Sequence, residues 1–328
     1  MTAFATIATS ALAVLLESPP QDNDEALHGR SSTGAASLAA PRSDVRDIFA
    51  RTLIADALLD ADIDTRSPVI DRTIQAIVRH RRALPAGEQP APLLCDLTSG
   101  AGELAQILLL FVRLGRRDLI ATHCAPPLAV LLAYAEADGV IPNWILPETA
   151  SAEDLETIAS LVYALARWDA RRFLGMIVAG ARWVAARQRP DGSWASASGP
   201  DPYHGTWLAL RLLGAVMPNH PAVPRAARFL NESRRPGSGW GADGSDPLAT
   251  ALGLLALLAT RTALPDDLPN DALAVLATGT HGWPAPPFLR LERGRDGEPI
   301  PVDHGSASMT ALFALKAILA LPPQYQSR

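Results

Sequence analysis

The sequence predicts an all-α protein that folds as one (α/α)6 barrel, a double ring of helical hairpins over residues 1–328. Three observations predict this fold. Alanine- and leucine-rich helical segments recur along the chain, more amphipathic segments alternate with them, and no segment keeps the apolar–polar alternation typical of a strand. Hydrophobic residues make up 48% of the 328 residues, so the chain can bury a large core.

Six apolar segments are expected to form the inner ring, because several are apolar on nearly every side, as a helix buried all round must be. They begin near Asp47, Glu103, Asp154, Gly205, Ala249 and Ser308. No hairpin of this kind can cover its own apolar face, so each is expected to pack on the next until the ring closes.

Six amphipathic segments, with Arg, Asp and Glu recurring on one side, are expected to form the outer ring. They span residues 2–16, 67–82, 127–137, 172–187, 221–233 and 271–278. No Lys or Arg precedes the apolar run of the first, so we expect a packed helix and not a signal peptide. Residues 19–41 and 284–302 are expected to be irregular loops, the second a lid over one mouth of the ring.

Composition excludes several classes of partner. The net charge is -5 and the basic residues are scattered, which argues against nucleic acid. Lys316 is the sole lysine, a bias we attribute to genomic composition. Cys95 and Cys124 lie in different segments without metal-ligand spacing, which suits a reducing cytoplasm. No apolar run is long enough to span a membrane, and peripheral membrane contact remains open.

The strongest local motif is Trp183-Val-x3-Gln188-x3-Gly192-x-Trp194. It describes a helix end followed by a tight turn, in which Asp and Gly supply the turn and the aromatic residues pack across neighbouring helices. We interpret Gln188, Gly192 and Trp194 as scaffold residues, so the motif predicts fold and does not by itself predict chemistry.

A degenerate copy of the motif runs from Phe229 to Trp240, with Arg234 in the place of the Gln. Weaker traces lie at 138–144 and 281–283. Together these motifs resemble the QW repeats of the squalene-hopene cyclase and oxidosqualene cyclase superfamily, whose β-type domain is an α/α barrel. The resemblance covers roughly residue 127 to the C-terminus, and the first 120 residues match only by the rhythm of their hairpins.

The resemblance implies acid-initiated chemistry. Such cyclases carry a D-x-D-D-T-A motif at the start of an inner helix, and its central Asp protonates an alkene or an epoxide. The best match here runs from Asp246 to Ala251, where Leu248 occupies the position of the proton donor. Leucine cannot supply a proton, so we expect the start of another inner helix to supply the acid.

Polar residues at the starts of the inner helices are expected to converge, because parallel inner helices present their N-termini at one mouth. We favour Asp303 with His304 as catalytic residues, since a His beside a carboxylate can hold or relay a proton at neutral pH. Further catalytic candidates are Asp246, Asp44 and Asp47. Other polar residues expected at this mouth are Arg46, Glu103, Glu153, Asp154, Glu156, Tyr203, His204, Thr206, Thr250, Ser306 and Ser308. Each has a plain alternative interpretation as a residue that caps or begins a helix.

Residues expected to bind substrate are Trp207, Tyr203, His204, Thr250, Glu103 and Phe288. Aromatic faces stabilise carbocations, which is why isoprenoid cyclases line their sites with them. Aromatic residues are only 5% of the chain, so we expect a small substrate or a single ring closure.

We therefore expect an enzyme similar to class II terpene cyclases, which binds an isoprenoid or polyene and catalyses acid-initiated cyclisation or isomerisation without a cofactor or metal. A non-catalytic prenyl- or lipid-binding protein remains an alternative. So does a zinc-dependent prenyltransferase-like enzyme with ligands drawn from His204, His304, Asp303 and Cys95, or a glycoside-hydrolase-like enzyme. Since the cyclases place their site between two helical domains, a homodimer or a separate partner domain is expected to help exclude water.

Overall fold

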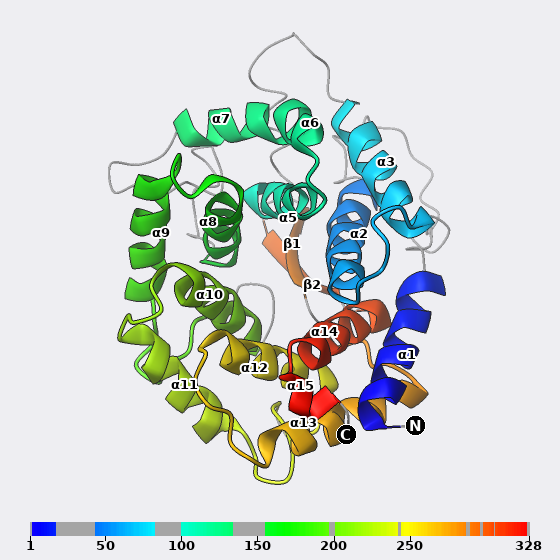
Figure 1. Ribbon diagram of the computed structural model, residues 1–328. Coiled ribbons are helices and arrows are strands. Elements are labelled where there is room, and N and C mark those ends of the chain that lie inside the picture. The colour runs from blue at the N-terminus through cyan, green and yellow to red at the C-terminus, as the bar shows by residue number, and fades with distance from the viewer. Residues whose placement is uncertain are drawn as a thin grey trace.

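Helices in the computed structural model form two concentric rings (Figure 1). The structure describes residues 2–17, 43–82, 100–133, 155–196, 201–241, 244–286, 289–295, 298–304 and 306–326. The inner ring consists of α2 (Ser43–Asp60), α5 (Gly100–Arg113), α8 (Leu155–Asp169), α10 (Tyr203–Val216), α12 (Pro247–Ala259) and α14 (Ala307–Leu319). Each inner helix contacts the next and α14 contacts α2, so the ring closes and the predicted fold is confirmed.

The outer ring follows the predicted segments closely. It consists of α1 (Ala3–Glu17), α3 (Pro68–Arg82), α7 (Ala125–Ala133), α9 (Leu174–Ala186), α11 (Ala222–Ser233) and α13 (Leu268–Thr278). A short helix α6 (Arg117–Leu119) and a π-helical turn η3 (Ile120–Cys124) lead into α7, and η5 (Gly279–His281) and α15 (Pro323–Gln326) are single turns. Among the described residues, no helix has both the length and the apolar character that crossing a membrane requires.

The first helix completes the outer ring beside the last inner one. Ile7, Ala11 and Leu15 recur every four residues on one face of α1 and are buried, so that face packs against α13 and α14. The Ser10 hydroxyl donates to the Thr280 carbonyl (3.3 Å) and accepts from the Trp283 indole (3.2 Å). The expectation of a packed N-terminal helix is therefore confirmed.

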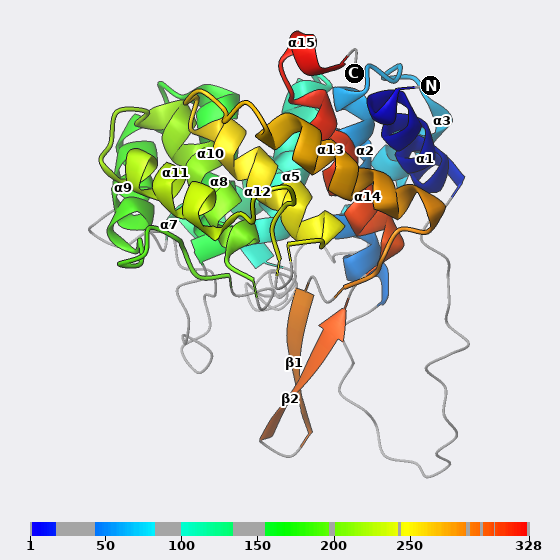
Figure 2. The same ribbon diagram turned by 90° about the horizontal axis from the view of Figure 1, so that it is seen from below.

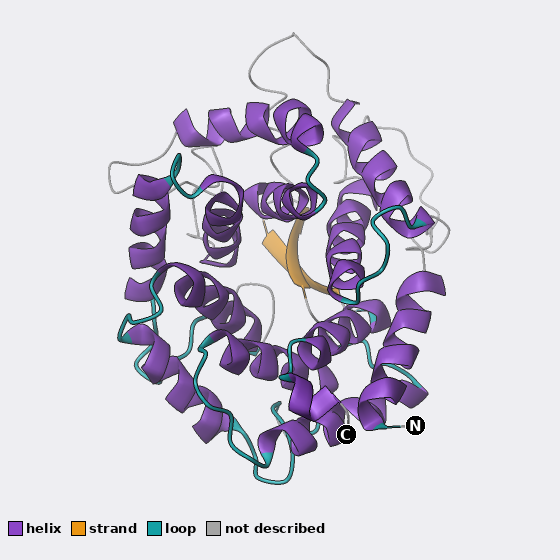
Figure 3. Cartoon of the chain, in the orientation of Figure 1, coloured by secondary structure: helices purple, strands orange, loops and turns teal. Residues whose placement is uncertain are grey.

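Part of the segment expected to be irregular is an antiparallel hairpin. Strands β1 (Leu289–Arg295) and β2 (Glu298–His304) pair with Leu289 opposite His304, and they are the only strands in the described part of the chain (Figure 3). Pro299 and Pro301 hid β2 from a search for strands, because proline is tolerated only where no ladder bond is needed, as on the outer side of a two-stranded ribbon. Figure 2 shows the hairpin projecting from the end of the ring where α14 begins. The other expected loop, 19–41, lies outside the described residues.

Two buried tryptophans hold consecutive hairpins together in the same way. The Trp194 indole donates to the Val184 carbonyl (2.7 Å), and its backbone N–H donates to the Thr206 hydroxyl (3.1 Å). In the degenerate copy of the motif, the Trp240 indole donates to the Leu230 carbonyl (2.9 Å), and its N–H donates to the Thr250 hydroxyl (3.1 Å). Each tryptophan thus ties the end of an outer helix to the start of the next inner helix.

The Gln and Arg of the two copies reach the next outer helix by different chemistry. The Gln188 amide donates to the carbonyls of Gly192 (2.9 Å) and Ala222 (2.8 Å), the second at the start of α11. Arg234 donates instead to the carboxylates of Asp267 (2.6 Å) and Asp271 (2.8 Å) at the start of α13. These bonds confirm that the motif residues are scaffold.

Candidate functional site

The starts of neighbouring inner helices meet at one end of the ring. The His204 imidazole at the start of α10 lies beside the Glu156 carboxylate at the start of α8. Asp201, just before α10, has its pKa raised by burial and by the nearby carboxylate of Asp246, which precedes α12. The expected convergence of these helix starts is therefore confirmed, and we call this end the N-terminal mouth.

Glu156 is the centre of a buried polar group at this mouth. Its Oε1 atom lies 3.2 Å from Nδ1 of His204 and accepts a 2.5 Å hydrogen bond from the Ser196 hydroxyl. The Glu156 and His204 side chains are only 8% and 13% exposed. A carboxyl group held by a hydroxyl and an imidazole can keep, donate and recover a proton.

Aromatic rings surround His204 on the inner side of the ring. Its imidazole lies 5.9 Å from the Trp207 ring and 6.1 Å from the Phe313 ring, and those two rings meet edge to face at 5.5 Å. Trp207 is on α10 and Phe313 is on α14, and α12 separates these helices in the ring. The three side chains therefore meet across the interior of the ring.

The inward face of α10 continues to Arg211. His204, Trp207 and Arg211 are spaced by three and four residues, so they lie on one face of the helix. The Arg211 guanidinium lies 4.7 Å from the Trp207 ring and 4.6 Å from the Tyr163 ring of α8. Burial lowers the pKa of Arg211. This side of α10 therefore carries, in order, the imidazole of His204, the indole of Trp207 and the guanidinium of Arg211.

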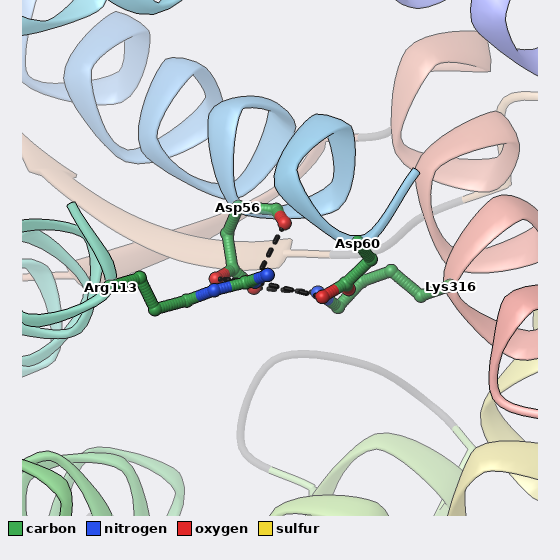
Figure 4. A network of polar contacts seen from close by, with 4 residues as sticks. All are labelled: Asp56, Asp60, Arg113 and Lys316. Atoms are coloured by element: carbon green, nitrogen blue, oxygen red, sulfur yellow. Dashed lines mark hydrogen bonds and ion pairs between the residues drawn. The ribbon is translucent and has the colours of Figure 1, made fainter. Parts of the chain in front are cut away.

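A network of four charged residues joins the opposite ends of three inner helices (Figure 4). Arg113 at the end of α5 contacts Asp56 (2.5 Å) and Asp60 (2.8 Å) of α2, and Lys316 of α14 contacts the same residues at 2.6 and 2.5 Å. Burial raises the pKa of Asp56, but Lys316 and Arg113 outweigh it and lower the pKa to about 2. Lys316, the sole lysine of the chain, therefore joins the last inner helix to the first. The scarcity of lysine had been attributed to genomic composition alone, which gave no indication of this role.

Of the residues expected to bind substrate, the structure brings His204 and Trp207 together and places two others elsewhere. Tyr203 stacks on Phe229 of outer helix α11 (6.3 Å), and burial raises its pKa, so it faces the other ring of helices. Thr250 is fully buried and accepts the bond from Trp240 described above, which is a structural role. These contacts show that polar residues at the start of an inner helix also face its neighbours, and substrate binding by Tyr203 and Thr250 stays a prediction. Glu103 is buried at the start of α5, and its role stays a prediction.

Among the catalytic candidates, only Asp246 has a described side chain. Asp246 accepts hydrogen bonds from the backbone N–H groups of Leu248 (2.8 Å) and Ala249 (3.1 Å), so it caps α12 as its plain interpretation predicted. The structure gives only the backbone of the other candidates: Asp44 and Asp47 in the first turns of α2, and Asp303 and His304 in β2. Their catalytic roles remain predictions, as does that of Asp246.

Among the described residues, no three His, Cys, Asp or Glu side chains gather as metal ligands. Of the four residues named for zinc, only His204 has a described side chain, so the zinc alternative stays a prediction. Phe288, which was expected to bind substrate, and Cys95, which was named as a zinc ligand, lie outside the described residues.

Glu156 and His204 were each expected at this mouth, but their pairing was not predicted, and neither Arg211 nor Ser196 was expected at the site. The available signal was the pattern of polar residues on otherwise apolar inner helices. In α10, His204, Trp207 and Arg211 interrupt a run of Ala and Leu at helical spacing. Glu156 and Tyr163 do the same in α8, seven residues apart. Such stripes predict an inward polar face when a helix is buried all round.

Comparison with known proteins gives a consistent result. Residues 148–261 match the family model of the squalene-hopene cyclase C-terminal domain. Over 221 residues the chain is 26% identical to a drimenyl diphosphate synthase from Streptomyces showdoensis, covering 64% of this chain and 40% of that protein.

Solved structures of terpene cyclases share the fold. An ent-copalyl diphosphate synthase from Streptomyces platensis has a TM-score of 0.58 at 19% identity, over 84% of this chain and 50% of that one. A variant of the type II terpene cyclase MstE from Scytonema, in complex with its substrate geranylgeranyl dihydroxybenzoate, has a TM-score of 0.62 at 16% identity, over 99% and 97% of the two chains. The chain thus spans half or less of the two diphosphate synthases and nearly all of MstE.

Proposed function

Because residues 148–261 match the squalene-hopene cyclase C-terminal domain and the chain shares the fold of solved terpene cyclases, we propose that the protein is an acid-initiated isoprenoid cyclase or isomerase. This match includes the QW repeats and agrees with the resemblance that they suggested. The relatives include a drimenyl diphosphate synthase and the type II terpene cyclase MstE, whose structure contains the substrate geranylgeranyl dihydroxybenzoate and which matches this chain over 97% of its own length. The choice of acid in this chain is a separate question, because Leu248 occupies the expected position.

The buried Glu156–His204 pair is the observation that carries the proposal. Protonating an alkene requires a strong acid that is shielded from water and faces the hydrocarbon. Glu156 and its partner His204 are mostly buried, and His204 lies against the Trp207 and Phe313 rings. The Ser196 hydroxyl donates to Oε1 of Glu156 and the His204 imidazole lies beside the same atom, so both side chains hold the Glu156 carboxyl group in place.

The proposed reaction begins when the Glu156 carboxyl transfers its proton to one carbon of a substrate double bond. A C–H bond forms there, and the other carbon becomes a cation that the electrons of a second double bond attack, closing a ring. Trp207 and Phe313 face this charge and stabilise it. Loss of a proton from a neighbouring carbon ends the reaction, so the product is an isomer of the substrate. His204 positions Glu156 and returns a proton to it.

Substitution of the acid tests this proposal. We would incubate wild type and Glu156→Gln with farnesyl diphosphate, geranylgeranyl diphosphate and squalene, and analyse the products by mass spectrometry. The expected result is turnover by wild type that falls at least about 100-fold in Glu156→Gln, the contribution expected of a positioned proton donor. Glu232→Gln, in an exposed position on α11, is the matched control. Equal turnover by Glu156→Gln would refute the assignment of Glu156.

A non-catalytic prenyl-binding protein remains the second candidate, and the Leu at the expected position of the proton donor favours it. The same incubations separate the two functions. A binding protein would retain an isoprenoid in both wild type and Glu156→Gln without converting it, whereas the enzyme converts it only when Glu156 is present.

A further inference from the structure

Arg211 is a cation inside the barrel, and two of its three guanidinium nitrogens have no hydrogen-bond partner among the described residues. Its Nε and Nη2 atoms are buried and have no hydrogen-bond partner in the part of the chain that the structure describes. A guanidinium offers five N–H donors in a fixed fork, and burying it without acceptors is costly. The Trp207 and Tyr163 rings hold it by cation–π contacts, which satisfy none of those donors.

The nearest carboxylates do not relieve this imbalance. Asp56 and Asp60 interact with Arg211 across the ring, but each is in direct contact with both Arg113 and Lys316. Three cations therefore share two carboxylates at this depth of the ring. The excess positive charge falls on Arg211, which retains part of its accessible surface although it lies deep among the inner helices.

We propose that Arg211 binds an anionic head group, a carboxylate or a phosphate, of the isoprenoid that reacts at Glu156. This inference rests on the proposed function and narrows its substrate class. Guanidinium groups pair with carboxylate and phosphate oxygens through two parallel hydrogen bonds, the contacts that Arg211 lacks.

The position of Arg211 also orients the substrate. It follows His204 by seven residues, which is two turns or about 10 Å along α10. An anion at Arg211 would place the hydrocarbon chain along Trp207 and its reacting double bond near Glu156. A neutral hydrocarbon such as squalene would leave the buried cation unpaired, so the site disfavours it.

Binding measurements with matched probes test this inference without depending on turnover. In the Glu156→Gln background we would titrate farnesyl diphosphate, farnesoic acid, farnesol and inorganic pyrophosphate by calorimetry. We expect at least one of the two anionic isoprenoids to bind about 10- to 100-fold more tightly than farnesol, from a charged hydrogen bond in a buried site. Arg211→Met should abolish that preference, and Arg228→Met, in an exposed position on α11, should keep it.

The unfolding temperature gives a second readout. If Arg211 had only a structural role, its replacement would lower this temperature. Without ligand, Arg211→Met should unfold at the same or a higher temperature than wild type, because the substitution removes a buried charge that lacks acceptors. A lower unfolding temperature with an unchanged preference for the anionic probes would overturn the inference.

The remaining outcomes separate this inference from the proposed function. Equal affinity for farnesol and both anionic isoprenoids would overturn the inference and leave the acid chemistry intact. Pyrophosphate binding as tightly as farnesyl diphosphate would also overturn it, because the head group alone would then suffice. If wild type converts isoprenoids but Arg211→Met keeps the anion preference, only the role of Arg211 fails.

Discussion

Replacing Lys316 by Met is the perturbation whose effect the structure specifies most fully. Lys316 contacts both Asp56 and Asp60 and is 10% exposed, so its removal leaves two partly buried carboxylates in direct contact with Arg113 only, among the described residues. Methionine keeps most of the length and the apolar stem of the side chain while deleting its charge. The effect of the substitution therefore reports on the ion pairs between the first and last inner helices.

The magnitude follows from the lowered pKa of Asp56. Burial raises this pKa, and the neighbouring cations, Lys316 foremost, lower it from 3.8 to about 2. At about 1.4 kcal/mol per unit, this shift contributes about 2 kcal/mol to the free energy of unfolding at neutral pH. Without Lys316 the cost of burial remains and the largest opposing charge is gone. We therefore expect Lys316→Met to lose about 2 kcal/mol.

Urea unfolding followed by circular dichroism at several pH values measures this loss and its pH dependence. A carboxylate whose pKa is lowered in the folded state stabilises the fold above the unfolded pKa, and this contribution is lost as pH falls through the folded pKa. The difference between wild type and Lys316→Met should therefore shrink as pH falls from 3.8 towards about 2.

The matched control is Arg116→Met. Arg116 hydrogen-bonds Asp118 and lowers its pKa to about 2, but that pair is exposed to solvent. Screening by water and salt should leave its removal without a measurable effect. If Lys316→Met were as stable as Arg116→Met at neutral pH, or if its deficit persisted unchanged in acid, the reasoning would be refuted.

Two further substitutions test the packing that positions the site. Trp240→Phe leaves the Leu230 carbonyl without its indole donor in a fully buried position, so the free energy of unfolding in a urea titration should fall by about 1–3 kcal/mol. An unchanged midpoint would contradict the role of the tryptophans in joining the helices. Gly205→Ala would place a Cβ atom 2.2 Å from the Ala195 carbonyl oxygen and should cost about 1–3 kcal/mol, whereas Gly175→Ala, which meets nothing within 4 Å, should lower no unfolding temperature.

The fold could be predicted from the sequence because the pattern that specifies it is local and repeated. Alternation of apolar and amphipathic segments predicted all twelve principal helices of the described residues, and the QW motif predicted the scaffold role of Gln188 and Trp194 but not their hydrogen bonds. The hairpin β1–β2 was missed because Pro299 and Pro301 mask the strand pattern.

The site was harder to predict because it depends on which side of an inner helix each residue occupies. His204 and Trp207 face the interior, whereas Tyr203, the neighbour of His204, faces an outer helix. One residue along a helix turns a side chain by about 100°, and a helix buried all round carries no amphipathic pattern to indicate its inward face. The pairing of Glu156 with His204 joins residues 48 positions apart and needed the closed ring to become visible.

Incorporation of deuterium from solvent tests the central claim most directly. Wild type and Glu156→Gln would each be incubated in D2O with the isoprenoid that wild type converts, and the products analysed by mass spectrometry. If Glu156 starts the reaction by protonation, the product of wild type carries one deuterium at the carbon that received the proton, the recovered substrate carries none, and Glu156→Gln yields no such product. A product without deuterium, or one formed equally well by Glu156→Gln, would contradict acid initiation by this residue.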